Sequence, residues 1–376
     1  MQTGDMQTGD MQTGDSAAIG LDVVRGAVAD AVRAPSVHNT QPWRFGVRGS
    51  RISLRADPDR RLDVADPYGR EMLISCGAAL YNLRLALRKR GYEPDVRLLP
   101  DADRPYLLAD VEARAVRDPV PDETGREYAQ IARRHSHRGG FRPDPVPAGV
   151  VEDLARAADR EGARLIEAAD VHVTGALAAL TGAAEHIQRR TPAYMSELVR
   201  WAPSPASTRR DGVQPEAYPK QTPRMEPDFA ARDFARGHGW GADPRDGEAG
   251  QSAEAGQGET GQGKVRQGEA EQSESGGAED DGATGVVLLL VTAGDGPDAW
   301  LRAGEALERV LLVAAGHGLA AAYHTQAMQV PELRESVRAH FCDGAYPQLL
   351  LRFGVPARRD PASVRRPVED VMVVEP

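Results

Sequence analysis

Apolar residues recur every three or four positions over residues 21–32, which predicts an amphipathic helix. Pro35 should end that helix, because proline cannot continue the helical hydrogen bonding. Two short apolar runs, residues 43–47 and 51–55, flank an Arg-Gly-Ser turn and predict a β-hairpin. Residues 72–90 are apolar around most of the helical circumference, so we expect a buried central helix there.

The same patterns predict further elements along the chain. Strands are expected at residues 96–99, 106–111, 286–292, 319–325 and 348–353. Helices are expected at residues 123–134, 150–160, 171–189, 192–201, 299–315 and 331–340. Helices and strands are thus mixed throughout the chain.

Two distant regions share one layout. Residues 76–96 and 303–323 each have small residues first, then an apolar helix, a glycine and a strand. Such a repetition predicts a tandem duplication with two related halves, residues 16–120 and 121–376.

Three stretches lack any such pattern. The pentapeptide MQTGD is written three times over residues 1–15, which we interpret as a disordered tail. Residues 203–240 lose periodicity but keep scattered aromatic side chains, as expected of a loop that covers a binding site. Residues 241–283 consist mostly of Gly, Glu, Gln, Ala and Ser, and burial there cannot offset the chain entropy. We expect a disordered insertion.

Composition narrows the class of protein. The chain has 376 residues, 41% of them hydrophobic, and a formal net charge of −10, which argues against general binding to nucleic acid or anionic membranes. Its lysines are Lys89, Lys220 and Lys264, so any phosphate bound by positive side chains must be bound mainly by arginines. Two cysteines form no framework, and no signal peptide or membrane-length apolar run is seen. We therefore expect a cytoplasmic protein.

Two short stretches hold residue types suited to ligand binding. Residues 34–45 read APSVHNTQPWRF, which is too rigid and polar for ordinary core and too rich in amides and aromatics for a plain linker. Residues 133–141 read RRHSHRGGF, and arginines make charge-assisted hydrogen bonds to phosphate. The residues alone leave a plain alternative open for each stretch. The first can be a helix-to-strand connector with Trp43 in the core, and the second can be a solvated helix end. Zinc binding is disfavoured, because no carboxylate or cysteine lies at ligand spacing from the histidines.

With these motifs the chain resembles the nitroreductase-like FMN-binding family and, within it, the fused single-chain Acg-type branch. APSVHNTQPWRF is similar to the family's APS-x-x-N-x-QPW-x-F segment. Arg134, Ser136 and Arg138, followed by Phe141, resemble the family's Arg-x-Ser-x-Arg/Lys stretch. Residues 303–335 resemble a third, less specific region of the family.

The resemblance covers most of residues 20–240 and 285–376 and implies an α+β, FMN-dependent nitroreductase-like fold. Each half should hold a mainly antiparallel sheet packed by helices, with long central helices at the interface of a pseudo-dimer. Family members are usually homodimers whose FMN sites take the basic motif from one subunit and the Ser/Asn turn from the other. Here the first half has the turn and the second half has the basic motif, which implies one complete FMN site per chain.

The resemblance also implies a set of cofactor-binding residues. Arg134, Ser136 and Arg138 would hold the FMN phosphate, and Ser36 and Asn39 would face the ribityl chain or the ring edge. The expected cofactor-binding residues are Arg134, His135, Ser136, Arg138, Pro35, Ser36, His38, Asn39, Gln41, Gln326 and Arg366, with Arg365 beside the last in a tail that reaches the phosphate. No catalytic side chain and no metal ligand are expected, because the flavin N5 carries the chemistry.

The implied function is that of a flavoprotein oxidoreductase. Hydride would pass from NAD(P)H through the flavin to a nitro compound, a quinone or a similar small-molecule acceptor. An alternative is a flavin-sequestering protein whose loop at residues 203–240 excludes NAD(P)H, and a third is a cofactor-free relative with a structural role. As a fused pseudo-dimer the protein should be monomeric, with no nucleic-acid or membrane partner.

Overall fold

The computed structural model describes residues 19–218, 227–232, 234, 283–358 and 360–376. The predicted tail at residues 1–15 lies outside these ranges, as does the predicted insertion at residues 241–283 except for its last residue. Parts of the predicted covering loop, residues 203–240, lie outside them as well.

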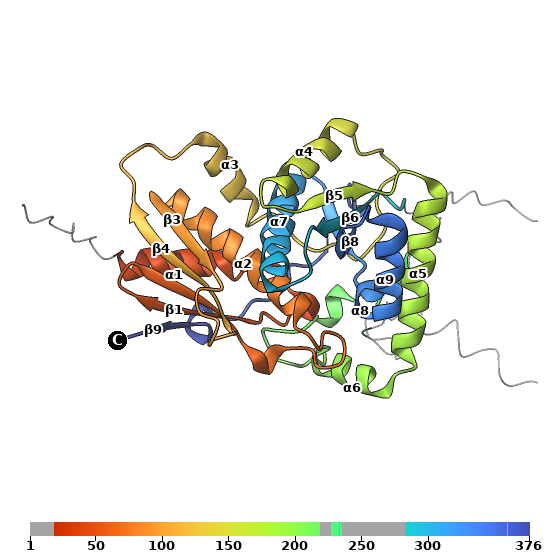
Figure 1. Ribbon diagram of the computed structural model, residues 1–376, viewed down its shortest axis with the longest axis horizontal. Helices are drawn as coiled ribbons and strands as arrows, with labels where there is room; N and C mark the ends of the chain where they lie inside the picture. Colours follow the sequence, from red (N-terminus) through yellow and green to blue (C-terminus); the bar gives the residue numbers. More distant parts are fainter. Residues whose placement is uncertain (1–18, 219–226, 233, 235–282, 359) are drawn as a thin grey trace, which may run out of the picture.

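One sheet is built almost wholly from the first third of the chain (Figure 1). Its strand order is β3-β4-β2-β1-β9, antiparallel except between β1 and β9. Its strands are β1 (Trp43–Arg48), β2 (Arg51–Ala56), β3 (Tyr92–Leu98), β4 (Leu107–Ala115) and β9 (Met372–Val374). Helices α1 (Leu21–Ala31) and α2 (Arg70–Lys89) bury their apolar faces with this sheet in one core. β9 comes from the end of the chain and places Met372 opposite Phe45.

The second sheet is antiparallel throughout, in the order β5-β6-β8-β7. Its strands are β5 (Arg164–Glu167), β6 (Val286–Thr292), β7 (Ala320–Tyr323) and β8 (Tyr346–Gly354). Alternate residues of β6 enter two different cores, Leu288 and Leu290 on one face and Val287 and Leu289 on the other. This double burial explains why the strand reads as a continuous apolar run.

Helices cover both faces of the second sheet. One core includes α4 (Ala148–Asp159) and α7 (Pro297–Gly316). The other includes α5 (Val171–Arg189), α8 (Gln326–Gln329) and α9 (Pro331–Phe341), which lie at the right-hand edge of Figure 1. Two further helices, α3 (Asp122–Gln130) and α6 (Pro192–Arg200), flank this body.

Helices α2 and α7 join the two sheets at the centre of the molecule (Figure 1). Both begin and end 227 residues apart in the chain. Gly77 and Gly304, also 227 apart, let the backbones touch: a Cβ on Gly77 would lie 2.1 Å from the Leu301 carbonyl oxygen, and one on Gly304 would lie 2.0 Å from that of Ile74. The pairing is therefore nearly symmetric, with equivalent residues facing each other.

The α+β fold class and the long paired central helices are confirmed. Most predicted elements appear within two or three residues of their expected bounds, and the predicted helix at 171–189 and strand at 286–292 match α5 and β6. The sequence patterns missed β5, α8 and β9, each at most four residues long. Such short elements show too little periodicity to be detected.

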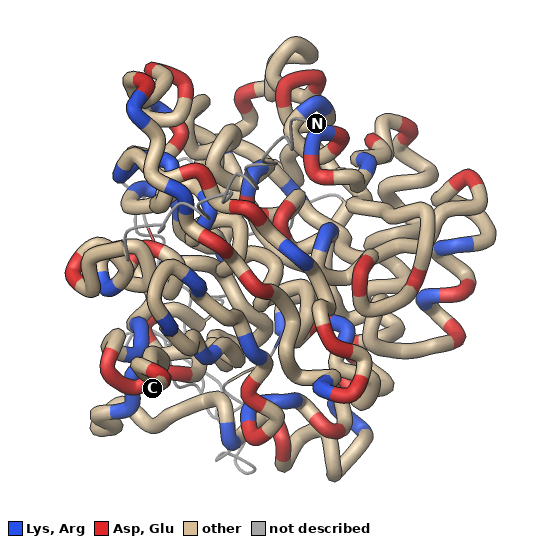
Figure 2. The backbone as a smooth tube through the Cα atoms, turned by 60° about the vertical axis from the view of Figure 1, so that its left-hand side comes forward, with Lys and Arg blue, Asp and Glu red and all other residues tan. Residues whose placement is uncertain are grey.

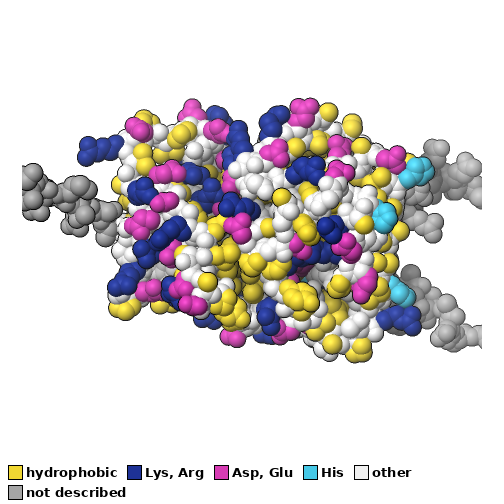
Figure 3. Space-filling model, in the orientation of Figure 1, with side chains coloured by type: hydrophobic (Ala, Val, Ile, Leu, Met, Phe, Trp, Pro, Cys, Tyr) yellow, Lys and Arg dark blue, Asp and Glu magenta, His cyan; other side chains and the backbone are white. Residues whose placement is uncertain are grey.

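Charge is spread without a dominant sign. Figure 2 shows acidic and basic residues interleaved along most of the chain, and on the face in Figure 3 the two kinds are mixed. Among the helices of the described ranges, none combines the length and apolar content needed to cross a bilayer.

Candidate functional site

The turn after α1 has an unusual backbone. His38, Asn39 and Gln41 have φ values of 46°, 53° and 51°, a left-handed region that side-chain-bearing residues seldom adopt. The Ser36 hydroxyl accepts a hydrogen bond from the Gln41 amide at 3.0 Å, which fastens the turn. Pro35 is buried at its start. Strain concentrated in this way is typical of functional sites.

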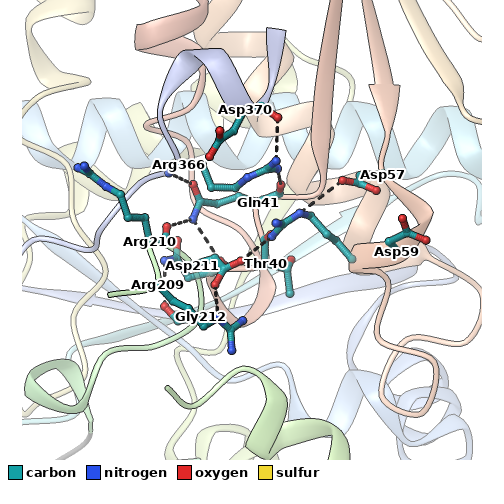
Figure 4. A network of polar contacts seen from close by, with 12 residues as sticks. Thr40, Gln41, Asp57, Asp59, Arg209, Arg210, Asp211, Gly212, Arg366 and Asp370 are labelled. Atoms are coloured by element: carbon teal, nitrogen blue, oxygen red, sulfur yellow. Dashed lines mark hydrogen bonds and ion pairs between the residues drawn. The ribbon is translucent and has the colours of Figure 1, made fainter. Parts of the chain in front are cut away.

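The amides of this turn hold two other chain segments. Asn39 Nδ2 donates to the carbonyl oxygens of Gly212 (2.9 Å) and Val364 (3.1 Å). Gln41 Nε2 donates to the Arg210 carbonyl at 2.8 Å, and its Oε1 accepts from the Arg366 amide at 2.7 Å. Figure 4 shows Gln41 between Arg210 and Arg366. These two side chains thus anchor residues 210–212 and the C-terminal tail to the turn.

A buried arginine stands where the basic motif begins. The side chain of Arg134 is 5% exposed, and its Nη2 donates to the Arg33 carbonyl at 3.0 Å. Its Nε lies 3.6 Å from Glu308 Oε1, while Nε and Nη1 have no hydrogen-bond partner among the described residues. Burial raises the pKa of Glu308, and Arg134 opposes that rise. Asn82 on α2 donates to the same carboxylate at 2.9 Å.

The rest of the motif lies beside Tyr323 of β7. Ser136 forms a parallel bridge with Ala321 and lies next to the Tyr323 hydroxyl. Burial raises the pKa of Tyr323 to about 12, against the opposing effect of Arg134. Arg138 donates its backbone amide to Asp360 at 3.2 Å, and burial lowers the pKa of its guanidinium.

The tail brings a third arginine to this place. Arg365 donates to Asn39 Oδ1 at 3.0 Å and to the Arg33 and Ala34 carbonyls at 3.1 Å each. Burial, together with the repulsion of Arg134, lowers its pKa to about 9. Its Nε has no hydrogen-bond partner in the described ranges. We call Arg134, Arg138 and Arg365 the arginine cluster.

The remaining predicted residues contact several different segments of the chain. Arg366 donates to the Asp370 carbonyl at 2.8 Å and lies with the turn rather than with Arg134. His135 is half-buried, and its Nδ1 lies 3.2 Å from the Arg133 carbonyl. Gln326 donates to the Ala230 carbonyl at 3.0 Å. Within the described part of the chain, no three His, Cys, Asp or Glu side chains form a metal site.

Sequence reasoning missed several residues of this site. Glu308 and Asn82 lie on the central helices, and the available signal was a polar residue within a largely apolar helix. His137 is 1% exposed and has both ring nitrogens occupied, by Asp360 at 2.5 Å and the Gly140 carbonyl at 2.9 Å. It holds the basic motif in place, and nothing in its spacing revealed this.

The arrangement suits a buried anion. The guanidinium groups of Arg134 and Arg365 lie close together and keep buried donors without partners in the described ranges, and an unmade buried hydrogen bond costs about 1–3 kcal/mol. Arg138 adds a further positive charge beside Tyr323. A phosphate supplies acceptors for several such donors at once. The charge and the spare donors of the cluster therefore suit a phosphorylated ligand.

Comparison with known proteins identifies relatives of the chain. The chain is 32% identical over 343 residues to a Mycobacterium tuberculosis protein named "Putative NAD(P)H nitroreductase Rv3131", covering 90% of this chain and 87% of that one. It is 28% identical over 356 residues to one named "Putative NAD(P)H nitroreductase acg", covering 94% and 96%. No family model matches the chain.

The chain belongs to the nitroreductase family, in its Acg-type branch. Among solved structures, it matches a nitroreductase with bound FMN from Desulfitobacterium hafniense at 13% identity and a TM-score of 0.37, covering 66% of this chain and 98% of that one.

Proposed function

We propose that the protein is an FMN-dependent oxidoreductase of the nitroreductase type, using NAD(P)H to reduce a nitro compound, a quinone or a similar acceptor. The observation that carries this proposal is the arginine cluster, with buried nitrogens on Arg134 and Arg365 that lack partners in the described ranges. The names of its relatives, which include NAD(P)H nitroreductase, support the same reading.

The residues divide the binding task between them. Arg134, Ser136 and Arg365 would hold the phosphate by charge-assisted hydrogen bonds, with Glu308 and Asn82 keeping Arg134 in position. Arg138 and the turn at residues 35–38 would border the flavin ring. The amides of Asn39, Gln41 and Gln326 would act one step further out, by fixing the segments that enclose the site.

Bound FMN would supply hydride acceptance and donation at N5. Each turnover on a nitro compound would oxidise one NAD(P)H, take up one proton and release one water as the nitro group becomes nitroso. No side chain needs to serve as a nucleophile in this reaction, so the protein's contribution is binding, orientation and exclusion of water.

A specific observation favours a second candidate, a flavin-sequestering protein with little NAD(P)H turnover. Residues 209–212 are fastened across the turn by side chains as well as by backbone (Figure 4). Asp211 pairs with Arg60 and with Arg209, at 2.8 Å in each case. A covering segment held this firmly would hinder entry of the nicotinamide.

We also propose one FMN site per chain, in a monomer whose halves divide near residue 120. Because α2 and α7 are related by an offset of 227 residues, each position near one helix has an equivalent near the other. The region equivalent to the arginine cluster contains a cavity of about 450 Å³, which we call the counterpart pocket. Its lining includes Gly91 and Tyr92, which correspond to Gly318 and Leu319 beside Arg134. There Arg309 pairs with Glu161 at 2.7 Å and lies 3.8 Å from Glu127, so its charge is already compensated.

Two measurements on the purified protein test the proposal. A visible flavin spectrum and titration with FMN should give about one FMN per chain; a colourless protein that takes up no FMN would contradict both candidates. Anaerobic addition of NADPH then separates them. Bleaching of the flavin band within seconds supports the oxidoreductase, and a persistent band supports sequestration.

A further inference from the structure

A second group of buried polar side chains lies beyond the arginine cluster, on the side of the covering segment. His38, Tyr194 and Arg232 are 8%, 4% and 9% exposed. Both ring nitrogens of His38, the Tyr194 hydroxyl and Nη1 of Arg232 have no hydrogen-bond partner among the described residues. Buried polar groups are normally satisfied, so this concentration indicates a ligand that completes them.

These side chains meet around Phe234. The rings of His38 and Phe234 stand edge to face, 5.4 Å apart at 84°. Phe234 donates its amide to the Arg232 carbonyl at 3.1 Å, and the Arg232 guanidinium lies 5.7 Å from the centre of the Tyr194 ring. Burial, then Arg232 and Arg138, lower the pKa of His38, so the imidazole is neutral and close to both cations.

Arg232 is held in place through one nitrogen of its guanidinium group, which leaves the nitrogen Nη1 able to donate to a ligand. Its Nη2 donates to Gln329 Oε1 at 3.0 Å and to Thr325 Oγ1 at 3.4 Å. Gln329 is fixed in turn, because its Nε2 donates to Glu71 Oε2 at 2.7 Å. The carboxylates of Glu185 and Glu71 attract the positive charge of Arg232, yet neither accepts a hydrogen bond from Nη1.

The chemistry of the group selects a monoanion on a flat ligand. One guanidinium nitrogen, one phenol and one neutral imidazole match the two oxygens of a carboxylate. A dianionic phosphate would meet the nearby Glu71 and Glu185 with too little positive charge. The rings of Phe234, Tyr194 and His38 make the surroundings of these polar groups aromatic, which suits an aromatic ligand.

Building on the proposed function, we propose that His38, Tyr194 and Arg232 form the acceptor subsite. Its preferred electron acceptor is an aromatic compound carrying a carboxylate, which Arg232 Nη1 and the Tyr194 hydroxyl bind.

The test compares two nitroaromatics and one unreactive probe on the FMN-loaded protein. Calorimetry measures the affinity for benzoate, which the flavin cannot reduce. Stopped flow measures how fast the dithionite-reduced protein is reoxidised by 4-nitrobenzoate and by its neutral analogue, 4-nitrobenzamide. We expect benzoate binding and faster reoxidation by 4-nitrobenzoate.

Variants assign these effects to Arg232. Arg232→Gln should weaken benzoate binding by about 10- to 100-fold and remove the preference for 4-nitrobenzoate, with 4-nitrobenzamide little changed. Arg232→Lys keeps the charge and should retain most of the affinity. Arg117→Gln, at an exposed position after β4, is the matched control and should behave as the wild type.

Equal benzoate affinity in the wild type and Arg232→Gln would overturn the subsite. So would loss of NADPH reduction in Arg232→Gln with unchanged benzoate affinity, because that places a dinucleotide phosphate at Arg232. Absence of the flavin band is a different result, which defeats the proposed function. Benzoate titration of that flavin-free chain, with Arg232→Gln beside it, would still decide the subsite.

Discussion

The arginine cluster and the counterpart pocket occupy equivalent places on a nearly symmetric helix pair, yet their electrostatics differ. On one side Glu308 and Asn82 meet a buried arginine that keeps spare donors. On the other side, the residues at the equivalent positions are Tyr81, in place of Glu308, and Arg309, in place of Asn82. Tyr81 donates to Glu127, and Arg309 lies 5.9 Å from the Tyr81 ring centre.

If one FMN site per chain is correct, as proposed, the counterpart site has lost binding while the fold is kept. Beside the counterpart pocket a further carboxylate, Glu161, accepts hydrogen bonds from Arg309 and Arg84 at 2.7 Å each. Arg84 also donates to Glu305 at 2.5 Å. These cations stabilise the protein's own carboxylates. The arginine cluster instead leaves its donors for a ligand, so binding capacity depends on which charges stay uncompensated.

The largest effect should come from breaking the counterpart network. Glu161→Gln removes the carboxylate shared by Arg84 and Arg309, and loss of one partner of a largely buried ion pair costs about 3 kcal/mol. Chemical denaturation should show this decrease, while the FMN affinity stays unchanged. A parallel fall in FMN affinity would mean that the two regions are not independent.

Arg138→Ala should lower the FMN affinity rather than the stability, the opposite of Glu161→Gln. It should weaken FMN binding by about 1.5–3 kcal/mol, the value of hydrogen bonds to charged groups, with little change in the stability of the apoprotein. Fluorescence titration with FMN measures the first quantity and apoprotein denaturation the second. Arg309→Ala is the matched control, and flavin content equal to that of Arg138→Ala would remove the distinction between the regions.

The helix pair that relates the two regions can be tested directly. Gly304→Ala would drive a Cβ into the Ile74 carbonyl and should cost about 1–3 kcal/mol through overpacking. Gly182→Ala in α5 meets no atom within 4 Å and should stabilise the protein by about 0.5–1 kcal/mol. Thermal denaturation of both variants measures the contrast, and similar melting temperatures would contradict close helix contact.

The smallest effect should come from the ion pairs of Asp211, which hold residues 209–212 in place. Hydrogen bonds from Arg60 and Arg209 outweigh the effect of burial and lower the pKa of Asp211. Its stabilising contribution is present above the unfolded pKa, near 4, and is lost as the pH falls through the lower folded pKa. Asp211→Asn should therefore speed flavin release a few-fold at pH 7, and this acceleration should diminish at an acidic pH below the unfolded value of about 4. Equal acceleration at both pH values would contradict this role.

The sequence predicted the long elements well, because their apolar periodicity extends over many residues. It also marked the turn at residues 36–41 and the basic motif as binding residues, which the structure brings to the same region. It could not show that Asn39 and Gln41 hold backbone segments more than 150 residues away. Nor could it separate Arg365 from Arg366, since neighbouring residues point to different partners only after the tail has docked.

The pairing of Phe45 with Met372 sets the order in which the protein can be completed during synthesis. Strand β1 leaves the ribosome early, but its edge stays open until residues 372–374 have emerged. Arg365 arrives with the same terminal segment. We therefore expect nascent chains halted before residue 360 to retain no flavin, because they still lack both Arg365 and β9.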